Sequence, residues 1–289
     1  MIPITGHTRL TALLGSPVAH SISPLMHNEA FQLLDLDYTY LCFEVNEETL
    51  PAAVDGLKAC GIRGFNLTMP NKNKIVELLD ELSPAARLIG AVNTVVNDDG
   101  HLTGYNTDGV GYMQAVKDAG YDITGKTITI MGAGGAATAI CAQAALDGVE
   151  KIHIFARETS RFWDRTQKLA ENINSTLPCK AVLHENKDTA ALAQAISESA
   201  LLLNATSVGM APNTEGTIIE DTSLYHPDLI VSDVIYNPRE TRFLKEAREA
   251  GCRTFNGMYM LLYQGAEAFR LWTGKEMPVK EIKAKFFAD

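Results

Sequence analysis

Short apolar runs alternate with amphipathic helical stretches along the first part of the chain. Strands are predicted at residues 9–15, 38–45 and 64–69, with helices at 23–34 and 50–60 between them. Such an alternation is typical of a parallel sheet whose strands are joined by crossover helices. The first part of the chain is therefore predicted to be an α/β unit.

The pattern changes after residue 90, where two short strand-like runs flank Asp99 and Gly100. An Asp-Gly dipeptide suits a type I′ turn, which joins two antiparallel strands. We predict that a β-hairpin closes a first domain of residues 1–108.

A second alternating series begins with a predicted helix at residues 109–120. Further strands are predicted at residues 127–131, 151–155, 181–184, 201–204, 229–234 and 253–255. Helical stretches lie between most of these strands, so the pattern predicts a doubly wound sheet over residues 109–261. Residues 262–289 are mostly amphipathic helix, and we expect them to return to the first domain and complete it.

Composition and charge narrow the classes of partner. The chain has 289 residues, 46% of them hydrophobic, and a formal net charge of -10 without any run of like charges. An acidic surface attracts neither nucleic acid nor an anionic membrane, so we expect a small-molecule partner. Five widely spaced cysteines predict neither a disulfide framework nor a metal site. With no signal peptide or membrane-spanning run in the sequence, we expect a cytoplasmic protein, either a monomer or a homodimer.

A glycine-rich loop, GAGGAA at residues 132–137, follows the first strand of the second series and precedes a helix of small residues. Gly132 permits a tight turn, Gly134 lets a pyrophosphate approach the backbone, and Ala137 allows helix and strand to pack closely. The helix start adds free N–H groups and a positive dipole end. The predicted fold class is therefore α/β, with an N-terminal α/β substrate domain followed by a Rossmann dinucleotide-binding domain.

The choice of dinucleotide is predicted from the end of the next strand. An acidic side chain there accepts the ribose hydroxyls of NAD, whereas an arginine meets the 2′-phosphate of NADP. Glu158 favours NAD, while Arg157 and Arg161 suit a phosphate. Glu150 precedes the strand, so it lies at the N-terminal end and not at the C-terminal end, where the ribose would bind. The loop favours NAD and leaves NADP open.

Lys72 follows a strand-like run in which Phe65, Leu67 and Met69 alternate as an inward face would. A lysine in a loop is usually a solvated side chain, which is how we interpret Lys74. Lys72 comes after an Asn, a Thr and a Pro suited to position it, so it is also a candidate catalytic base.

The polar clusters of the first domain, followed by the glycine loop, resemble the shikimate dehydrogenases. The matching motifs are S-x-S at Ser21 and Ser23, N-x-T-x-P-x-K from Asn66 to Lys72, A-V-N-T at Asn93, N-T-D at Asp108, NATSVGM from Asn204 and YNP at Tyr236. The ending GMYMLLYQGAEAFRLWTGK is most similar to the quinate/shikimate dehydrogenase branch. Members of that branch can use NAD.

The resemblance implies hydride transfer between NAD(P) and shikimate or 3-dehydroshikimate. It implies that Lys72 transfers the proton and that Asp108 is its paired carboxylate. The implied substrate-binding residues are Lys72 and Asp108 themselves, Ser21 and Ser23 for the carboxylate, Thr68, Asn93 and Gln264 for ring hydroxyls, and Tyr236 nearby. The predicted cofactor-binding residues are Gly132, Ala133, Gly134, Gly135, Ala136, Ala156, Arg157, Glu158, Thr206, Val234, Gly257 and Met258.

A lysine, with a free-solution pKa of roughly 10.4, is a poor base at neutral pH because most of it carries the proton already, so Lys72 must be partly desolvated or share a proton network. We expect burial to oppose the effect of the Asp108 carboxylate and the two groups to titrate together.

Simpler interpretations of these residues stay open. Ser21 and Ser23 would also suit caps for a helix near residue 24, and Asp108 would suit a cap for the helix after it. Asn93 and Asn106 would suit turns beside the hairpin.

Three other side-chain groups have ordinary explanations. His20 and His27 flank the serines, but no third ligand has metal spacing, so no metal is predicted. Cys60 and Cys141 are expected to be buried. Phe162 and Trp163 suit either adenine stacking or helix packing.

Alternative functions also remain. Quinate would be the main substrate if the pocket recognises its additional hydroxyl. A dinucleotide-binding redox sensor without catalysis would be expected to lack Lys72 or Asp108, yet both are present. Another two-domain dehydrogenase, acting on a folate or an amino acid, explains the glycine loop but not the S-x-S and N-x-T-x-P-x-K clusters.

Overall fold

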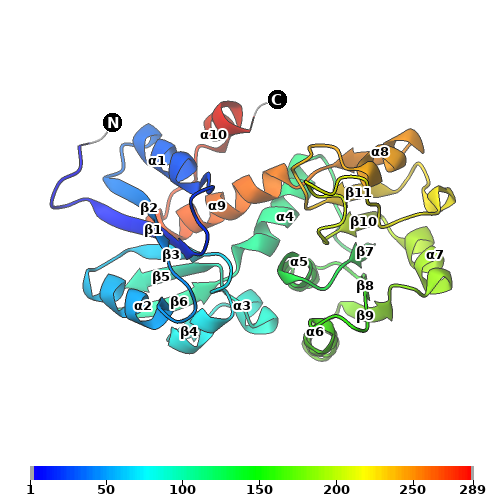
Figure 1. The fold of residues 1–289 in the computed structure, drawn as a ribbon, viewed down its shortest axis with the longest axis horizontal. Coiled ribbons are helices and arrows are strands. Elements are labelled where there is room, and N and C mark those ends of the chain that lie inside the picture. Colours follow the sequence, from blue (N-terminus) through cyan, green and yellow to red (C-terminus); the bar gives the residue numbers. More distant parts are fainter. Residues whose placement is uncertain (1–2, 288–289) are drawn as a thin grey trace. The chain divides into compact units, whose positions relative to one another are not determined.

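The chain divides into two compact units in the computed structural model, which describes residues 3–287. One unit combines Met1–Gly111 with Leu262–Asp289, and the other is Tyr112–Leu261. Each unit is built around its own six-stranded sheet (Figure 1). The α/β fold class predicted from the alternation of strands and helices is confirmed.

The sheet of the first unit is mixed, with the strand order β2-β1-β3-β5-β6-β4. Its strands are β1 (Arg9–Gly15), β2 (Tyr38–Glu44), β3 (Gly64–Leu67), β4 (Glu81–Leu82), β5 (Thr94–Asp98) and β6 (His101–Tyr105). β1 pairs in parallel with β2 and β3, whereas β5 runs antiparallel to β3 and β6. Asp99 and Gly100 both have positive φ at the turn between β5 and β6, so the predicted hairpin is confirmed.

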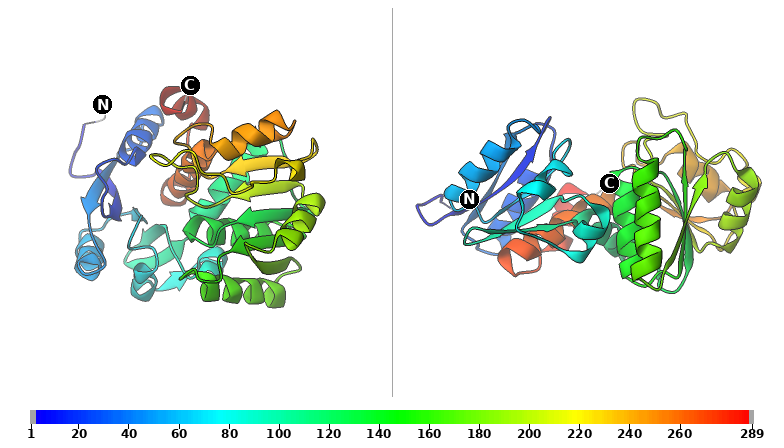
Figure 2. Two further views of the ribbon diagram at one scale, coloured as in Figure 1. Left: turned by 45° about the vertical axis from the view of Figure 1, so that its right-hand side comes forward. Right: turned by 90° about the horizontal axis from the view of Figure 1, so that it is seen from below.

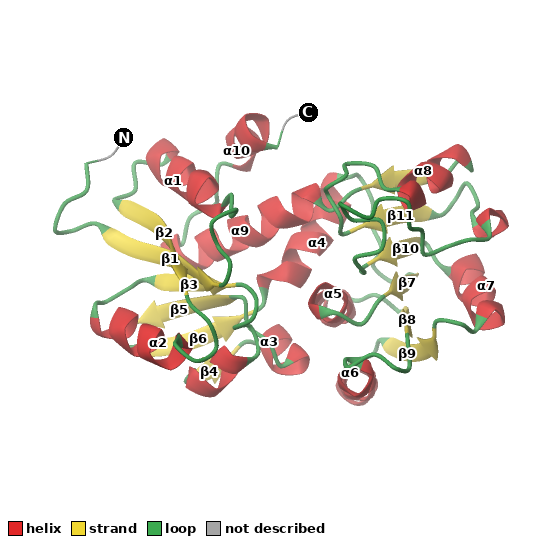
Figure 3. Cartoon of the chain, in the orientation of Figure 1, coloured by secondary structure: helices red, strands yellow, loops and turns green. Residues whose placement is uncertain are grey.

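Helices cover both faces of this sheet (Figure 3). They are α1 (Ser23–Leu33), α2 (Leu50–Ala59), the 3-10 helix η1 (Lys74–Leu78), α3 (Pro84–Ile89), α9 (Met258–Thr273) and α10 (Val279–Phe286). Leu50 and Val54 of α2 join Phe65 and Leu67 of β3 in one apolar core. On the other face α1 and α9 meet, and Phe31 stacks on Phe269 with 5.1 Å between ring centroids. The C-terminal helices therefore complete the first unit.

The sheet of the second unit is entirely parallel, with the order β12-β11-β10-β7-β8-β9. Its strands are β7 (Thr127–Met131), β8 (Lys151–Ala156), β9 (Lys180–Glu185), β10 (Leu201–Asn204), β11 (Ile230–Asp233) and β12 (Arg253–Phe255). The helices are α4 (Thr107–Asp118), which begins in the first unit, α5 (Gly135–Leu146), α6 (Trp163–Thr176), α7 (Thr189–Glu198), the 3-10 helix η2 (Thr222–Leu224) and α8 (Arg242–Glu249). α5 and α6 lie on one face, α7 and α8 on the other, which is the doubly wound arrangement (Figure 2).

Several local expectations were wrong. β3 ends at Leu67, two residues early, and Met69 is 75% exposed because the chain turns away from the sheet before Pro70. The helix expected from residue 109 begins at Thr107 and includes Asp108, which therefore is not its cap. Cys60 follows α2 and is exposed, whereas Cys141 is buried. All five cysteines are free.

Within residues 3–287, no helix combines the length and the apolar character needed to cross a membrane. Over the same residues, no group of His, Cys, Asp and Glu side chains is arranged to hold a metal ion.

Candidate active site

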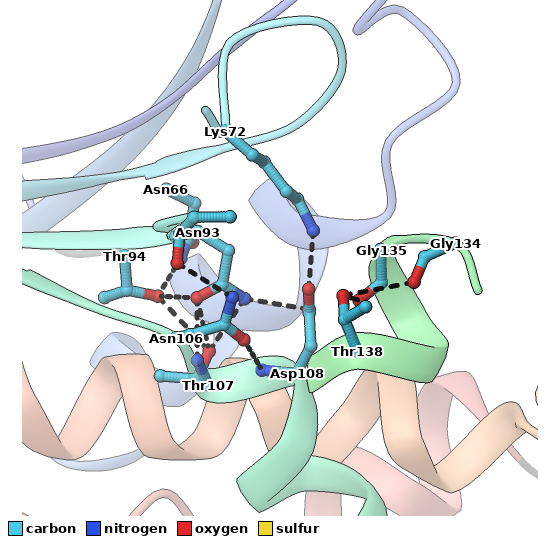
Figure 4. Close-up of polar contacts among 11 residues, drawn as sticks. Asn66, Lys72, Asn93, Thr94, Asn106, Thr107, Asp108, Gly134, Gly135 and Thr138 are labelled. Carbon is cyan, nitrogen blue, oxygen red and sulfur yellow. Dashed lines mark hydrogen bonds and ion pairs between the residues drawn. The ribbon is translucent and has the colours of Figure 1, made fainter. Parts of the chain in front are cut away.

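The first unit holds Lys72 and Asp108 in direct contact. The Nζ atom of Lys72 lies 2.6 Å from Oδ2 of Asp108 (Figure 4). The two side chains keep 29% and 16% of their surface exposed, so the pair is half-buried but reachable. A charge-assisted contact of this length fixes the two groups relative to each other.

Asn93 holds the second oxygen of the Asp108 carboxylate. Its Nδ2 donates to Oδ1 of Asp108 over 2.8 Å. The orientation of the Asn93 amide is set in turn, because its Oδ1 accepts from the backbone N–H of Thr107 over 2.7 Å. Asn93 is almost completely buried. The carboxylate is therefore held from both sides, by the Asn93 amide on one oxygen and by Nζ of Lys72 on the other.

The hairpin and the start of α4 explain how residues distant in sequence meet. Asn93 precedes β5 and Asp108 follows β6, so the antiparallel pairing brings them together. Asn106 accepts the backbone N–H of Asp108 and donates to the carbonyl of Ala91. This places Asp108 in the first turn of α4.

Lys72 is held by the loop after β3. Its backbone carbonyl accepts from the N–H of Val92 over 2.8 Å, next to Asn93. Earlier in this loop the backbone of Thr68 donates to the carbonyl of Leu14. A Cβ on Gly15 would come within 2.2 Å of the Thr68 side chain, so only glycine permits this approach. The end of β1 thus fixes the loop that carries Lys72.

Asn66 connects the pair to the aromatic face of the sheet. Its Nδ2 donates to the Asn93 carbonyl and to the Thr94 hydroxyl, and its Oδ1 accepts from the Tyr40 hydroxyl over 2.8 Å. Thr94 also donates to Oδ1 of Asn93. These buried amides and hydroxyls form one continuous hydrogen-bond network behind Asp108 (Figure 4).

The remaining predicted substrate residues do not all join this network. Ser23 is the first residue of α1, and its backbone N–H donates to Oγ of Ser21 over 3.2 Å. The N-cap position itself belongs to Ile22, so neither serine is the cap that a simpler interpretation required. Gln264 is partly buried on α9 in the first unit. Tyr236 follows β11 in the second unit and is 47% exposed.

The glycine loop has the geometry that a pyrophosphate requires. Gly132 has a φ of 124°, and a Cβ there would come within 2.7 Å of the Ala205 carbonyl oxygen. Gly134 is the N-cap residue of α5, with no side-chain cap. Around Gly134 and Gly135, an added Cβ would meet nothing within 4 Å among the described residues. The first N–H groups of α5 are therefore accessible to an anion.

A cavity of about 1200 Å³ opens beside this loop within the second unit. The predicted residues that line it are Gly132, Ala133, Gly134, Ala156, Arg157 and Thr206. Gly135 and Ala136 begin α5, Glu158 is exposed after Arg157, and Val234, Gly257 and Met258 lie near the ends of β11 and β12. The chain thus offers a small-residue cradle, a cation and a cavity, which together fit a dinucleotide.

Some lining and positioning residues escaped the sequence interpretation. Thr94 and Thr107 stood inside quoted motifs, but threonine beside a turn or helix start has too many ordinary roles to identify. Asn186 and Lys187 line the cavity from the loop after β9. Phe162 also lines it, whereas Trp163 begins α6. No sequence motif marked the β9 loop.

Known protein families and relatives match this chain over most of its length. The model of the shikimate dehydrogenase substrate binding domain matches residues 13–95, and that of the shikimate 5'-dehydrogenase C-terminal domain matches residues 257–285. A shikimate dehydrogenase (NADP(+)) of Listeria monocytogenes serotype 4b is 55% identical over 284 residues, covering 98% of this chain and 97% of its own. A quinate/shikimate dehydrogenase of Escherichia coli SMS-3-5 is 45% identical, covering 97% of each chain.

A solved structure is also similar over nearly the whole chain. It is a shikimate 5-dehydrogenase from Listeria monocytogenes in complex with shikimate and NAD. The TM-score is 0.95 at 56% identity, with 97% of each chain covered.

Proposed function

The chain belongs to the shikimate dehydrogenase family, and on that premise we propose that it interconverts shikimate and 3-dehydroshikimate with NAD or NADP. The observation that carries the proposal is the Lys72–Asp108 pair, held in the first unit by Asn93. A dehydrogenase acting on an alcohol needs a group that takes the hydroxyl proton. The dinucleotide, when bound, supplies the hydride acceptor for oxidation and the hydride donor for reduction.

Lys72 moves the proton in this proposal. In the oxidation, the uncharged amine form of Lys72 takes the proton of the substrate hydroxyl on Nζ while the same carbon loses a hydride to the dinucleotide. Asp108, 2.6 Å from Nζ, stabilises the ammonium group that results. In the reduction, the ammonium group returns the proton to the new alkoxide oxygen. Partial burial keeps bulk water from competing with the hydroxyl for Lys72.

The other polar groups of the first unit orient the substrate. The hydroxyls of Ser21 and Ser23 bind its carboxylate, since hydroxyl donors are suited to an anion. Thr68, Asn93 and Gln264 hold ring hydroxyls. Asn93 binds the substrate from an orientation that Thr107 has already fixed, which lowers the ordering cost of binding.

The second unit binds the dinucleotide. Gly132, Gly134 and the first turn of α5 hold the pyrophosphate, and the cavity beside them takes the adenosine half. Arg157 lines the cavity and suits a 2′-phosphate, whereas the exposed Glu158 repels one. We therefore propose that both dinucleotides serve, with NAD preferred. The relative named for NADP(+) and the structure with bound NAD are consistent with dual use in this family.

Quinate is a second candidate substrate because one relative at 45% identity is a quinate/shikimate dehydrogenase. A catalytically silent dinucleotide sensor is the alternative of another class, and measurable turnover would dispose of it.

One assay tests the proposal. The purified protein is given shikimate or quinate with NAD or NADP, and the initial rate of nicotinamide reduction is followed at 340 nm. We expect turnover of shikimate with both dinucleotides and a higher kcat/KM with NAD. A chain that turns over neither acid with either dinucleotide would contradict the proposed activity.

A further inference from the structure

A buried carboxylate that the proposed chemistry does not use lies at the end of the second sheet. Asp233 is the last residue of β11, and its side chain has no exposed surface. Its Oδ1 accepts from the backbone N–H of Ile235 over 2.9 Å. Its Oδ2 accepts from Nδ2 of Asn204 over 3.1 Å and from Oγ1 of Thr241 over 2.8 Å. Three donors from three segments thus converge on one carboxylate.

Asn204 connects the Asp233 carboxylate to the loop that lines the cavity. It ends β10, directly opposite Asp233 in the parallel register. Its Oδ1 accepts from the backbone N–H and the hydroxyl of Thr206, over 3.0 and 2.7 Å. Its Nδ2, besides the bond to Asp233, donates to the carbonyl of Val208. Both Thr206 and Val208 line the cavity, so the Asn204 side chain shapes the loop of residues 205–208.

The loop after β11 is held from the same point. Ile235 is tied to the Asp233 carboxylate, and the N–H of Val234 donates to the Asn204 carbonyl over 3.0 Å. The Ile235 carbonyl then accepts from the N–H of Gly257. Two of these residues, Val234 and Gly257, belong to the set proposed for the dinucleotide. Asp233 therefore stands between two loops that both serve that site.

The chemistry of the cluster requires a carboxylate. An ionised carboxylate only accepts hydrogen bonds, whereas an amide of the same shape has one accepting and one donating end. In place of Oδ2, an NH₂ group would face the two donors Asn204 and Thr241. A buried charge persists only when such donors satisfy it, which these three do. An apolar packing role would have no need of them.

We propose that Asp233 is a positioning residue of the dinucleotide site, whose carboxylate holds the loops 205–208 and 234–236 in their binding arrangement. The inference rests on the proposed function, because it takes the cavity to be a dinucleotide site. Asp233 itself is fully buried and does not line the cavity.

The test compares Asp233→Asn with Thr129→Val. Thr129 is buried on β7, and its hydroxyl lies 2.8 Å from that of Ser199, outside the cavity lining, so its loss weakens the fold without touching either loop. Dinucleotide affinity is measured by titration calorimetry, and KM is measured for dinucleotide and for shikimate. We expect Asp233→Asn to weaken dinucleotide affinity about tenfold, with the shikimate KM within about twofold of wild type. Thr129→Val should lower the melting temperature and leave dinucleotide affinity unchanged.

A second variant covers the case in which Asp233→Asn does not fold. Thr241→Val removes one donor to the carboxylate at nearly constant volume and should weaken dinucleotide affinity about threefold. Wild-type affinity in every folded variant of Asp233 and Thr241 would overturn the proposal. Calorimetry measures binding without turnover. If the wild type binds dinucleotide but does not oxidise shikimate, the proposed activity is contradicted. The affinities of the Asp233 and Thr241 variants would still test this inference in that case. A wild type that binds neither NAD nor NADP would overturn both.

Discussion

Asp108 lies 36 residues beyond Lys72, yet their side chains meet at 2.6 Å. Both residues stood in motifs of the family resemblance, whereas the usual role of a loop lysine favours a solvated Lys72. The motifs did not reveal the hydrogen bonds that hold these side chains in place. Thr107 orients Asn93 through its backbone N–H, a contact that any residue but proline could make. Such positioning depends on the folded backbone, so the sequence pattern carried no sign of it.

The proposed proton transfer by Lys72 can be tested against a control variant at Lys74, two residues further along the chain. Lys72→Ala should lower kcat about a thousandfold, because no other group replaces the proton acceptor, with little change in dinucleotide affinity. Lys74 pairs with Glu77 at 2.7 Å and is more exposed, so Lys74→Ala should keep near-wild-type kcat. Steady-state kinetics on shikimate at saturating dinucleotide gives both values. Full activity in Lys72→Ala would remove Lys72 from the chemistry.

Among the elements, periodicity predicted the longer strands and helices well and the short ones poorly. The two-residue strand β4 and the six-residue helix α3 are too short to produce a period. β3 ends at Leu67 because the chain turns there, and the Asn71 N–H donates to the Thr68 carbonyl across that turn. Both errors fall between β3 and β5, where the chain forms loops and short elements instead of extending the sheet.

At the edge of the first sheet, a side chain of helix α1 is predicted to stabilise strand β2. β2 is an edge strand, and Asn28 of α1 binds its backbone as a neighbouring strand would. Its Oδ1 accepts from the Tyr40 N–H over 2.8 Å, and its Nδ2 donates to the Tyr40 carbonyl over 3.0 Å. Asn28→Ala leaves both groups of a buried residue unpaired and should cost about 2 kcal/mol of unfolding free energy.

Urea denaturation at pH 7 measures that loss. Gln32, one turn further along α1, is exposed, and Gln32→Ala is the control that keeps the edge contact. Equal stability of Asn28→Ala and wild type would mean that water satisfies the edge of β2 as well as Asn28 does.

For the whole molecule, alternation of strands and helices sufficed to predict two sheets. The amphipathic helical pattern after residue 261, which holds no further strand, led us to expect a return to the first unit, and residues from Leu262 onward belong to that unit. That return depends on the apolar face of α9, where Phe269 and Trp272 are fully buried. A buried histidine of α1, which no sequence pattern revealed, packs against this face of α9. His27 of α1 has no exposed surface, stacks on Tyr40 at 4.5 Å between centroids, and has no hydrogen-bond partner at either ring nitrogen within the described structure.

This buried histidine makes the stability of the molecule depend on pH. Burial lowers the pKa of His27 from 6.5 to about 3, since an imidazolium ion there would lose its hydration. A lowered folded-state pKa means that the stabilisation is present above pH 6.5 and is lost as the pH falls towards 3. At about 1.4 kcal/mol for each pH unit, lowering the pH from 7 to 4.5 should remove roughly 3 kcal/mol through this residue alone.

His27→Phe removes the titrating group and keeps an aromatic ring in the cluster. Its free energy of unfolding in urea should fall by about 3 kcal/mol less than that of the wild type between pH 7 and pH 4.5. The exposed His20 supplies the control, because His20→Asn should show the wild-type pH dependence. Parallel pH curves for His27→Phe and the wild type would show that acid opens the aromatic cluster to water before it protonates His27. In that event the packing of α9 against α1, and not the charge of one ring, would set the acid limit of the fold.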